Sequence, residues 1–557
     1  MRVRLRVGLL FCLFSFFAGP SFAVDVARTS GTTGDEVIVD CLEGILILGN
    51  WGEVRKQTVD EFDGIEIEGV QLLRQHPNFV RTLYNRYVGK PLTQRLIWEI
   101  KRDIAHFYRS KNQPSVTLTI PRQNVSNGIL QIVVEEAKLG KVTVQGNCYF
   151  PIRWFSDAMR SIPGEPIDAQ TVLEDVAWLN LNPFRRTDAR YKPGDKPGVA
   201  DIELITIDRW PARLYLGGDN TGTISTDRNR MFFGFNFGKS VLKDGQISYQ
   251  FTFAPNWNRF YSHTASARLP LPWRHVWVLW GGYSQVEPTT SLAGMKNHGV
   301  SWQVATRYRI PIFSSLGLLQ TFVLGYDFKE TDNDMYLRSV KIFNVDADIN
   351  QFMLGYELGF RGEKVRVALN TEVYGNPGGI THANNNHAYE FLRYDAHSEY
   401  VYLKLAHSLA WRFCAGWFSY DLRGQIASTN LLPSEQFTMT GHEAVRGFEE
   451  RILNLDNAFI GTLTYETPHW SLAKAFGWNR KYDEFYLLAF FDGGCGGNHN
   501  PSIGESSFQN LASVGPGVRW QIDRYFTARF DYGFQLWHSG FDHISDSRYN
   551  FGMMLSY

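Results

Sequence analysis

The side chains best suited to chemistry in this 557-residue chain are an arginine and an aspartate. The arginine lies in Val445-Arg446-Gly447-Phe448, within the Pro- and Gly-containing segment 431–454. A guanidinium is permanently charged and binds a carboxylate through two parallel hydrogen bonds, which fix orientation as well as distance. Asp492 is the predicted partner, although most Arg and Asp residues are unrelated solvated charges. This pair predicts the anchoring of a loop rather than catalysis.

Groups for catalysis, metal binding or redox chemistry are not clustered in the sequence. The 14 histidines form no grouping with Ser or Asp of the kind that an enzyme needs. His382, His387 and His397 lie in an Asn-rich stretch and could bind a metal, but scattered exposed histidines are the more frequent case. Four cysteines beyond the leader lack CxxC or metal-site spacing, and the sequence specifies no pairs: Cys41, Cys148, Cys414 and Cys495. We therefore predict no enzyme, no cofactor and no metal.

Composition narrows the class of protein. The 56 basic and 56 acidic residues give a formal net charge of +0, so nucleic acid is not an expected partner. Aromatic residues reach 15%, and there are 50 glycines, as is typical of strand-rich barrel proteins. The mean hydropathy of −0.25, and the absence of an 18-residue apolar run beyond the first segment, argue against a helical membrane protein.

The first 23 residues predict a secretory signal peptide. Arg2, Arg4 and Arg6 precede an apolar run at 7–18, and Ser21-Phe22-Ala23 fits a cleavage site. An uncleaved membrane anchor is the alternative, and the shortness of the apolar run disfavours it. Residues 24–40 are polar and rich in Gly and Thr, which predicts a flexible lead-in.

An internal sequence repeat predicts two small α+β domains, at 41–137 and 138–209. Gly89-Lys90-Pro91-Leu92-Thr93 recurs 75 residues later as Gly164-Glu165-Pro166-Ile167-Asp168. Thr93 and Asp168 are predicted N-caps, because their side-chain oxygens can accept hydrogen bonds from free N–H groups at the start of a helix.

Apolar residues follow each cap at helical spacing. The predicted buried face of the first helix is Leu96, Ile97, Ile100, Ile104 and Phe107, and that of the second is Val172, Leu173, Val176 and Leu179. Strand-like runs precede and follow, giving a β-α-α-β-β order with the first strand at 44–48 or 64–67. We interpret these domains as docking modules whose sheet edge receives an extended peptide, with simple spacers as the alternative.

From about residue 210 to 557 the sequence alternates between apolar and polar residues. Val365, Val367 and Leu369 interleave with Arg366 and Asn370, for example, so successive side chains point to opposite faces. A water-soluble sandwich shows alternation too, but here the apolar faces are rich in aromatics and the polar faces carry both charges. About sixteen such runs lie between 212–222 and 548–557, which predicts a closed transmembrane β-barrel of about 16 antiparallel strands.

The strand around Asp492 has one apolar face and one mixed face. The apolar face consists of Phe485, Leu487, Ala489 and Phe491, and the mixed face of Tyr486, Leu488, Phe490, Asp492 and Gly494. Because the apolar face is expected to contact lipid, Asp492 is expected to face the lumen. A loop bearing Arg446 that folds inward could then reach it.

The last strand alternates up to an aromatic C-terminal residue. Its apolar positions are Tyr549, Phe551, Met553, Leu555 and Tyr557. This ending resembles the C-terminal signal by which bacterial outer-membrane barrels are recognised, so the barrel-assembly machinery is an expected partner during biogenesis.

Several motifs together resemble those of two-partner-secretion outer-membrane transporters of the haemolysin activation/secretion type. Val445-Arg446-Gly447-Phe448 resembles the VRGF/Y motif of their sixth extracellular loop, and Phe490, Asp492 and Gly494 match the F-x-D-x-G strand motif. The two upstream modules resemble polypeptide-transport-associated (POTRA) domains. Asn182-Pro183-Phe184-Arg185-Arg186, with Pro193-Gly194, resembles the second of these.

The resemblance implies a function in the bacterial outer membrane, with the POTRA domains in the periplasm. These domains would capture an unfolded exported protein, and the lipid-embedded barrel would pass it to the cell surface. It also implies that the carboxylate of the strand motif pairs with the loop arginine. The alternative is an insertase of the same superfamily that folds other barrels, and such insertases usually carry three or more POTRA domains. A passive porin would lack these domains altogether.

The sequence departs from the family pattern in two places. The paired glycines that often precede the loop motif are replaced here by Thr440-Gly441. Residues 24–40 are too short and too poor in helix formers to supply the N-terminal plug helix that some members carry.

Overall fold

The computed structural model describes residues 36–57, 59–60, 62–111, 116–196, 198–240, 244–289, 295–313, 318–337, 340–475, 477, 483–503, 506–539 and 545–557. The predicted signal peptide and most of the predicted lead-in lie outside these residues. The chain divides into two compact units, one of residues 1–109 with 116–135 and one of residues 110–115 with 136–557. Among the described residues, no helix is both long enough and apolar enough to span a membrane.

The first unit contains a four-stranded sheet in the order β3-β2-β6-β5, covered by helices. Its elements are β2 (Gly44–Leu48), β3 (Gly64–Glu68), α1 (Gln71–Arg74), α2 (Pro77–Tyr87), α3 (Gln94–Ser110), β5 (Val116–Thr119) and β6 (Ile129–Glu136), with a 3₁₀ turn at Trp51–Glu53. The sequence left 44–48 and 64–67 as alternatives, and both are strands. They pair in parallel, and β3 forms a free edge of the sheet.

Helix α3 covers the sheet with the face that the sequence predicts. Ile100, Ile104 and Tyr108 are fully buried in the core of this domain. Thr93 caps the helix as predicted, because its Oγ1 accepts a hydrogen bond from Leu96 N at 3.1 Å. The prediction of a flexible lead-in is wrong for its last residues. Strand β1 (Val37–Val39) pairs with β4 (Leu92–Thr93), which satisfies backbone groups that a loose segment would leave to water.

The second small domain has the predicted β-α-α-β-β order. Its elements are β7 (Lys138–Gln145), α4 (Ile152–Ser156), α5 (Ala169–Leu179), β8 (Arg185–Pro193) and β9 (Val199–Asp208), with sheet order β7-β9-β8. Asp168 accepts hydrogen bonds from the backbone N–H groups of Gln170 and Thr171, so it caps α5 as predicted. The prediction of Leu173 as a core residue is wrong, because its side chain is 58% exposed. It follows buried Val172 by about 100° around the helix and so turns away from the sheet.

The motif at 182–186 joins this domain to the barrel. Asn182 Nδ2 donates to Gly238 O at 2.7 Å, and Arg185 binds Asp244 through two hydrogen bonds of 2.7 and 2.6 Å. Gly238 is required there, since a Cβ would lie 2.1 Å from the ring of Phe184. The motif therefore acts as a structural joint within the second unit.

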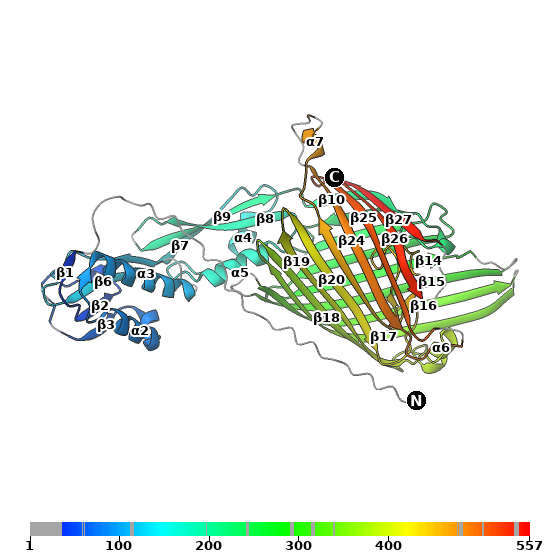
Figure 1. Cartoon of the computed structure of the whole chain (residues 1–557), viewed down its shortest axis with the longest axis horizontal. Coiled ribbons are helices and arrows are strands. Elements are labelled where there is room, and N and C mark those ends of the chain that lie inside the picture. The colour runs from blue at the N-terminus through cyan, green and yellow to red at the C-terminus, as the bar shows by residue number, and fades with distance from the viewer. Residues whose placement is uncertain are drawn as a thin grey trace. The chain divides into compact units, whose positions relative to one another are not determined.

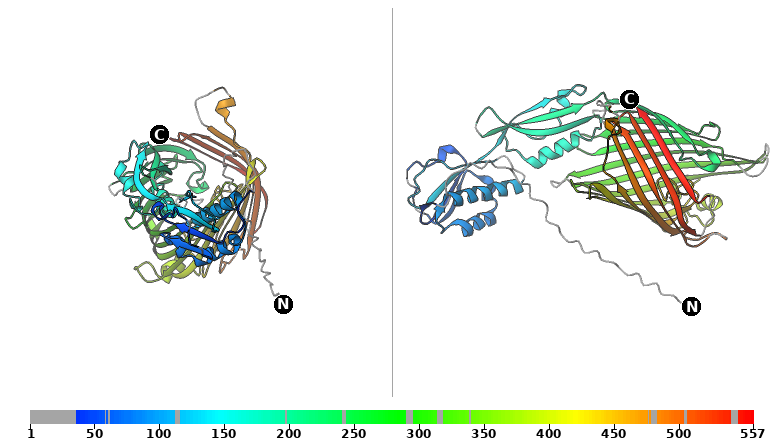
Figure 2. Two further views of the ribbon diagram at one scale, coloured as in Figure 1. Left: turned by 90° about the vertical axis from the view of Figure 1, so that its left-hand side faces the viewer. Right: turned by 45° about the horizontal axis from the view of Figure 1, so that its top comes forward.

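Sixteen antiparallel strands form a closed barrel, as predicted, and follow one another around its wall (Figures 1 and 2). They are β10 (Ala212–Asp219), β11 (Arg230–Phe237), β12 (Gln246–Phe253), β13 (Phe260–Pro270), β14 (Val276–Val286), β15 (Met295–Phe313), β16 (Leu318–Leu337), β17 (Val340–Arg361), β18 (Val365–Pro377), β19 (Glu399–Phe413), β20 (Gly416–Ala427), β23 (Asn457–Glu466), β24 (Asp483–Gly497), β25 (Gln509–Ile522), β26 (Phe526–Ser539) and β27 (Ser547–Ser556). We call the end where the chain enters from the second domain the near rim, and the opposite end the far rim.

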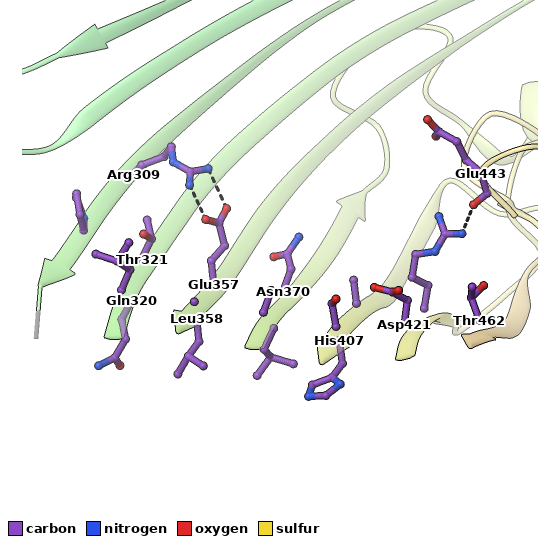
Figure 3. Close-up of a pocket in the computed structure, with 18 of the residues that line it drawn as sticks. Arg309, Gln320, Thr321, Glu357, Leu358, Asn370, His407, Asp421, Glu443 and Thr462 are labelled. Carbon is purple, nitrogen blue, oxygen red and sulfur yellow. Dashed lines mark hydrogen bonds and ion pairs between the residues drawn. The ribbon is translucent and has the colours of Figure 1, made fainter. Parts of the chain in front are cut away.

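The barrel wall separates an apolar exterior from a charged interior. Arg309, Glu357 and Asn370 project to one side of their strands, whereas Leu358 and His407 project to the other (Figure 3). Arg309 of β15 donates to Glu357 of β17 at 2.8 Å, across the intervening strand β16. Lipid cannot satisfy such charges, so their burial inside the barrel accounts for the alternation in the sequence.

The last strand closes the barrel against the first. Strand β27 pairs with β10, and Tyr557 extends this pairing through two hydrogen bonds with the backbone of Leu214, at 2.9 and 3.0 Å. The side chains of Tyr549, Met553, Leu555 and Tyr557 are all more than half exposed on the outer face. The aromatic terminus is therefore part of the seam of the barrel.

Smaller elements lie in the connections between strands. They are a 3₁₀ turn at Ile224–Thr226, α6 (Asn386–Leu392), β21 (Phe437–Thr438), β22 (Asn454–Leu455) and α7 (Leu472–Ala475). Strands β21 and β22 pair with each other within residues 428–456, which connect β20 to β23 at the far rim. We call residues 428–456 the lumenal loop, since they pack against inward-facing side chains of the wall.

Candidate functional site in the barrel lumen

We call residues 445–448 the tip of the lumenal loop. The tip is fixed to the barrel wall by the pair Arg446 and Asp492. Arg446 Nε and Nη2 donate to the two carboxylate oxygens of Asp492 at 2.8 and 2.9 Å. The backbone N–H of Arg446 adds a third hydrogen bond to the same carboxylate at 3.1 Å. Asp492 is fully buried on β24, and the Arg446 side chain is only 10% exposed. This geometry is two-pronged and desolvated, so it holds the tip in one orientation.

Two further groups surround the guanidinium. The Phe490 ring lies against it, with 3.4 Å from Arg446 Cζ to the ring centroid. Asp531 on β26 also lies close to the guanidinium, with 3.7 Å between its Oδ1 and Arg446 Nη1. Asp531 Oδ1 is buried without a hydrogen-bond partner, while its other oxygen accepts from Arg519 at 2.9 Å. Asp531 is not among the site residues predicted from the sequence, although its place on the inward face of β26 could have identified it.

The glycine of the tip motif is required by close backbone packing. Gly447 has φ = +91°, a conformation that favours glycine. A Cβ on Gly533 of β26 would lie 2.5 Å from Gly447 N, so neither position has room for a side chain. Gln535 Nε2 donates to Gly447 O at 2.8 Å. The loop backbone therefore lies directly on the wall.

Apolar residues on both sides of Arg446 anchor the tip in a small core. Val445 and Phe448 are fully buried, in a cluster that also contains Met439, Ile460 and Leu511. The third residue of the strand motif, Gly494, makes room for this cluster, since a Cβ there would lie 2.7 Å from Met439 Cε. All the predicted residues of the loop and strand motifs thus meet at one place.

Two glutamates that follow the tip motif also bind the wall. Glu449 pairs with Arg548 of β27 and, at 2.8 Å, with Arg228. Glu450 accepts a hydrogen bond from His442 N at 2.7 Å and from Asn550 Nδ2 at 3.4 Å. Burial raises the pKa of the Glu450 carboxyl to about 7. Burial also lowers the pKa of the neighbouring His442 imidazole to about 4.

The part of the lumenal loop that leads from β20 to the tip, which we call its first limb, is held by a separate set of hydrogen bonds around Glu435. Glu435 is buried and accepts hydrogen bonds from Lys329 at 2.6 Å, Tyr402 at 2.7 Å and Gln351 at 3.1 Å. Burial opposes its ionisation, but the charges of Lys329 and Lys404 outweigh this and lower the pKa of Glu435 to about 2. A permanently ionised carboxylate is therefore part of the loop's attachment. Glu435 was not selected from the sequence, because its role depends on side chains that lie 33 to 106 residues away in the chain.

The loop leaves two cavities in the lumen. One, of about 1100 Å³, lies between the tip and the near rim, where Asn180 and Leu181 of the second domain also line it. Its wall carries charges of both signs, including Arg309, Glu357 and Asp421 (Figure 3). The other, of about 600 Å³, is lined by the loop together with Glu372 and Lys404. Both cavities are lined by side chains of both charges, with apolar residues between them.

A third cavity, of about 470 Å³, lies on the first domain beside the edge strand β3. Ile65, Ile67 and Val80 line its floor, and Tyr84 stands at its margin. Gly64 and Glu68 direct their backbone groups toward neighbouring segments of the sheet, so those of Ile65 and Ile67 face the free edge. Arg74 occupies part of this edge, because its guanidinium donates to Ile67 O at 2.7 and 3.0 Å.

Within the described residues, no group of three or more His, Cys, Asp or Glu is placed to hold a metal ion. The four cysteines lie free and exposed: Cys41, Cys148, Cys414 and Cys495.

Comparison with known proteins agrees with this geometry. Residues 198–520 match the family model "Haemolysin secretion/activation protein ShlB/FhaC/HecB", and residues 61–137 match "POTRA domain, ShlB-type". The chain is 22% identical over 371 residues to the outer membrane transporter CdiB of Dickeya dadantii, an alignment that spans 63% of each chain. It is 18% identical over 388 residues to the heme/hemopexin transporter protein HuxB of Haemophilus influenzae, covering 68% of this chain and 67% of HuxB.

A solved structure shares the fold. CdiB from Escherichia coli superposes with a TM-score of 0.76 and 14% identity, covering 95% of this chain and 93% of that chain. Since the family model spans more than half of the 557 residues, the relationship extends beyond the short motifs. The chain therefore belongs to the ShlB/FhaC/HecB family of haemolysin secretion/activation proteins.

Proposed function

We propose that this chain is an outer-membrane transporter that captures an unfolded exported protein in the periplasm and passes it through the barrel to the cell surface. The observation that carries the proposal is the buried Arg446–Asp492 pair, which holds a loop inside a charged lumen. Such a loop closes the conduit at rest, and its displacement opens it. The family match and the ShlB-type POTRA match favour this function over the folding of other barrels.

Capture is assigned to the edge of β3 and the cavity beside it. An extended peptide can add to a free edge strand through main-chain hydrogen bonds, while alternate side chains enter a neighbouring groove. The groove of the first domain offers both, since Ile65 presents backbone groups at this edge and Ile65 and Ile67 line the groove with apolar side chains. Arg74 donates to Ile67 O, so a peptide that pairs there displaces this guanidinium. The ligand that fits is an unfolded segment with apolar side chains at every second position.

Passage requires space and a source of energy. The lumenal wall supplies a polar surface on which a hydrated chain can slide, and some of its charges are already paired, as in Arg309–Glu357. The sequence contains no phosphate-binding loop for nucleotide hydrolysis. We assign the driving force to folding of the exported protein outside the cell.

The test is export by cells that carry shortened or altered chains. Deleting residues 41–209 is expected to leave the barrel in the membrane and to abolish surface appearance of the exported protein, measured by immunoblotting of intact cells. A sharper variant is Val80→Asp, which puts a charge into the apolar groove. His106→Asp, at an exposed position of α3, is the matched control. Undiminished export by both the deletion and Val80→Asp would contradict the docking role.

A further inference from the structure

The lumenal loop has a second buried ion pair, at its base. Arg393 donates to both oxygens of Asp456 at 2.6 and 2.8 Å. Asp456 is fully buried, and the Arg393 side chain is 12% exposed. Asp456 immediately precedes β23, and Leu431 follows β20 by a few residues. We call these two positions the neck of the loop, since both limbs pass there on their way into the barrel.

The carboxylate of Asp456 also forms hydrogen bonds with backbone groups of other segments at the neck. Asp456 Oδ1 accepts a hydrogen bond from Leu431 N at 3.0 Å, and Arg393 donates to Leu431 O. Asp456 Oδ2 accepts from His499 N at 3.1 Å. One ion pair therefore connects the two limbs of the lumenal loop with two other segments of the far rim, residues 378–398 and 498–508.

The side chain of Asn430 connects the same three segments beside the ion pair. Asn430 Nδ2 donates to Tyr394 O at 2.9 Å and to Asn500 O at 2.8 Å. Asn500 N donates back to Asn430 Oδ1 at 2.8 Å. The three segments thus form a closed set of hydrogen bonds at the far rim.

Arg393 is itself fixed to the barrel wall. It follows α6, whose Tyr389 is fully buried. Tyr389 Oη donates to Asp348 O of β17 at 2.9 Å and accepts from Asn376 Nδ2 of β18 at 3.1 Å. Arg393 therefore reaches the neck from a segment that is hydrogen-bonded to the barrel wall.

The arginines of the neck and the tip differ in the number of carboxylates that lie close to each of them. Arg446 at the tip faces two carboxylates, Asp492 and Asp531, and one oxygen of Asp531 has no hydrogen-bond partner. It can shift between them without losing its counter-charge. Among the described residues, Arg393 pairs with Asp456 as its only carboxylate. Opening the neck would leave two buried charges uncompensated, which is costly.

We propose that Arg393 and Asp456 form a clasp that keeps the neck closed while the tip moves. This inference rests on the proposed transport function and deepens it. The conduit opens by rearrangement of the tip along the wall, and the loop does not leave the lumen as a whole. Arg393 is a positioning residue, because it acts by holding the loop where Arg446 meets Asp492.

The test uses the full-length purified protein in planar lipid bilayers, with potassium chloride as the conducted probe. Thr438→Cys and Asn454→Cys join the two limbs just inside the neck, since these residues are directly opposed and their side chains are hydrogen-bonded at 2.9 Å. The four native cysteines are replaced by Ser. We expect channel openings to have the same size and frequency in the oxidised and the reduced protein. Openings that the disulfide suppresses and a reductant restores would overturn the clasp.

A second set of variants separates positioning from general stability. Arg393→Ala should raise the opening frequency several-fold, and Arg393→Lys should restore part of the closure. In the Arg393→Ala background, Arg446→Ala should raise the opening frequency only slightly further. Arg309→Ala, which breaks a wall pair that does not touch the loop, should show simple additivity with Arg446→Ala. Wild-type openings in Arg393→Ala would overturn the clasp, whereas correct channel behaviour without export would overturn only the proposed function.

Discussion

At the scale of single residues, the central feature is that one guanidinium holds a loop tip against the barrel wall. Arg446 uses its side chain and its backbone N–H on one buried carboxylate, Asp492. The neighbouring Phe490 ring excludes water from one face of the guanidinium. Lysine could replace the charge but not the two-pronged geometry.

We expect Arg446→Ala and Asp492→Ala each to loosen the tip and reduce export while the barrel stays folded and heat-modifiable. Removing one partner of a buried pair costs about 3–5 kcal/mol, against about 0–1 kcal/mol for an exposed pair. The double variant should be little worse than either single one, because both remove the same contact. Arg446→Lys should recover only part of the export. Simple addition of the two single defects in export assays would show that the residues do not act together.

Glu450 predicts a dependence of loop packing on pH. Its pKa in the folded loop is about 7, above the ordinary value of 4.5, so the neutral form fits the site better. The stabilisation is complete below pH 4.5 and is lost as the pH rises through 7. The groups around it are His442, Asn550, Asp219 and Arg451, and His442 titrates near pH 4, below this range.

Protease access to the lumenal loop should therefore increase as the pH rises from about 4.5 to 7 and level off above that, and Glu450→Gln should remove this dependence. The measurement is limited proteolysis of the purified protein at a series of pH values, with Glu443→Gln as the control on the same loop. An unchanged pH profile in Glu450→Gln would refute the assignment.

At the scale of elements, the strand pattern fixes which side chains face lipid. Val367 and Phe530 belong to the outer face, and Arg366 and Arg529 to the inner face. Single cysteines at the first two positions should resist a membrane-impermeant thiol reagent, and those at the last two should react. The four exposed native cysteines must be replaced first. A charge at the lipid midplane costs about 2–4 kcal/mol and much less near a rim, so Val367→Arg, two residues into β18 from the near rim, should impair assembly only weakly. Equal labelling of both faces would rule out the register.

The strands were predictable because their pattern is local. Each run of alternating residues carries its own two faces, so sixteen strands and the inward position of Asp492 follow without knowledge of the fold. Strands β15 to β17 extend further than their alternation indicates, because neighbouring strands satisfy their backbone even where the side-chain pattern fades. Leu173 was misplaced because helical spacing alone does not set how wide the buried face is.

The other contacts of the lumenal loop were not predictable. Glu435, Asp456 and Asp531 are ordinary acidic residues in the sequence, and each gains its role from partners on distant strands or loops. The Arg446–Asp492 contact could be predicted only because a strand face and a family motif pointed to the same carboxylate. Strand β1 was missed because a three-residue strand has too few residues to show a period.

At the scale of the whole molecule, one chain contains the proposed capture surface, the joint at residues 182–186 and the barrel that we propose as the conduit. The first domain offers a free edge beside an apolar groove. The Arg185–Asp244 pair fixes the second domain to the barrel, and residues of that domain line the lumenal cavity. A protein that enters there meets the loop tip before it reaches the far rim.

The most direct test of the transport proposal is to detect the exported protein inside the lumen. A photocrosslinking residue is placed at Asn370, which lines both lumenal cavities, and in a second variant at Val373, which is 40% exposed on the outer face of the same strand. The cargo, identified as a protein whose surface appearance depends on this chain, is stalled by a stably folded domain fused to its C-terminus. We predict crosslinks to the stalled cargo from Asn370 and none from Val373. Export without any crosslink at Asn370, or with equal crosslinks at both positions, would contradict passage through the lumen.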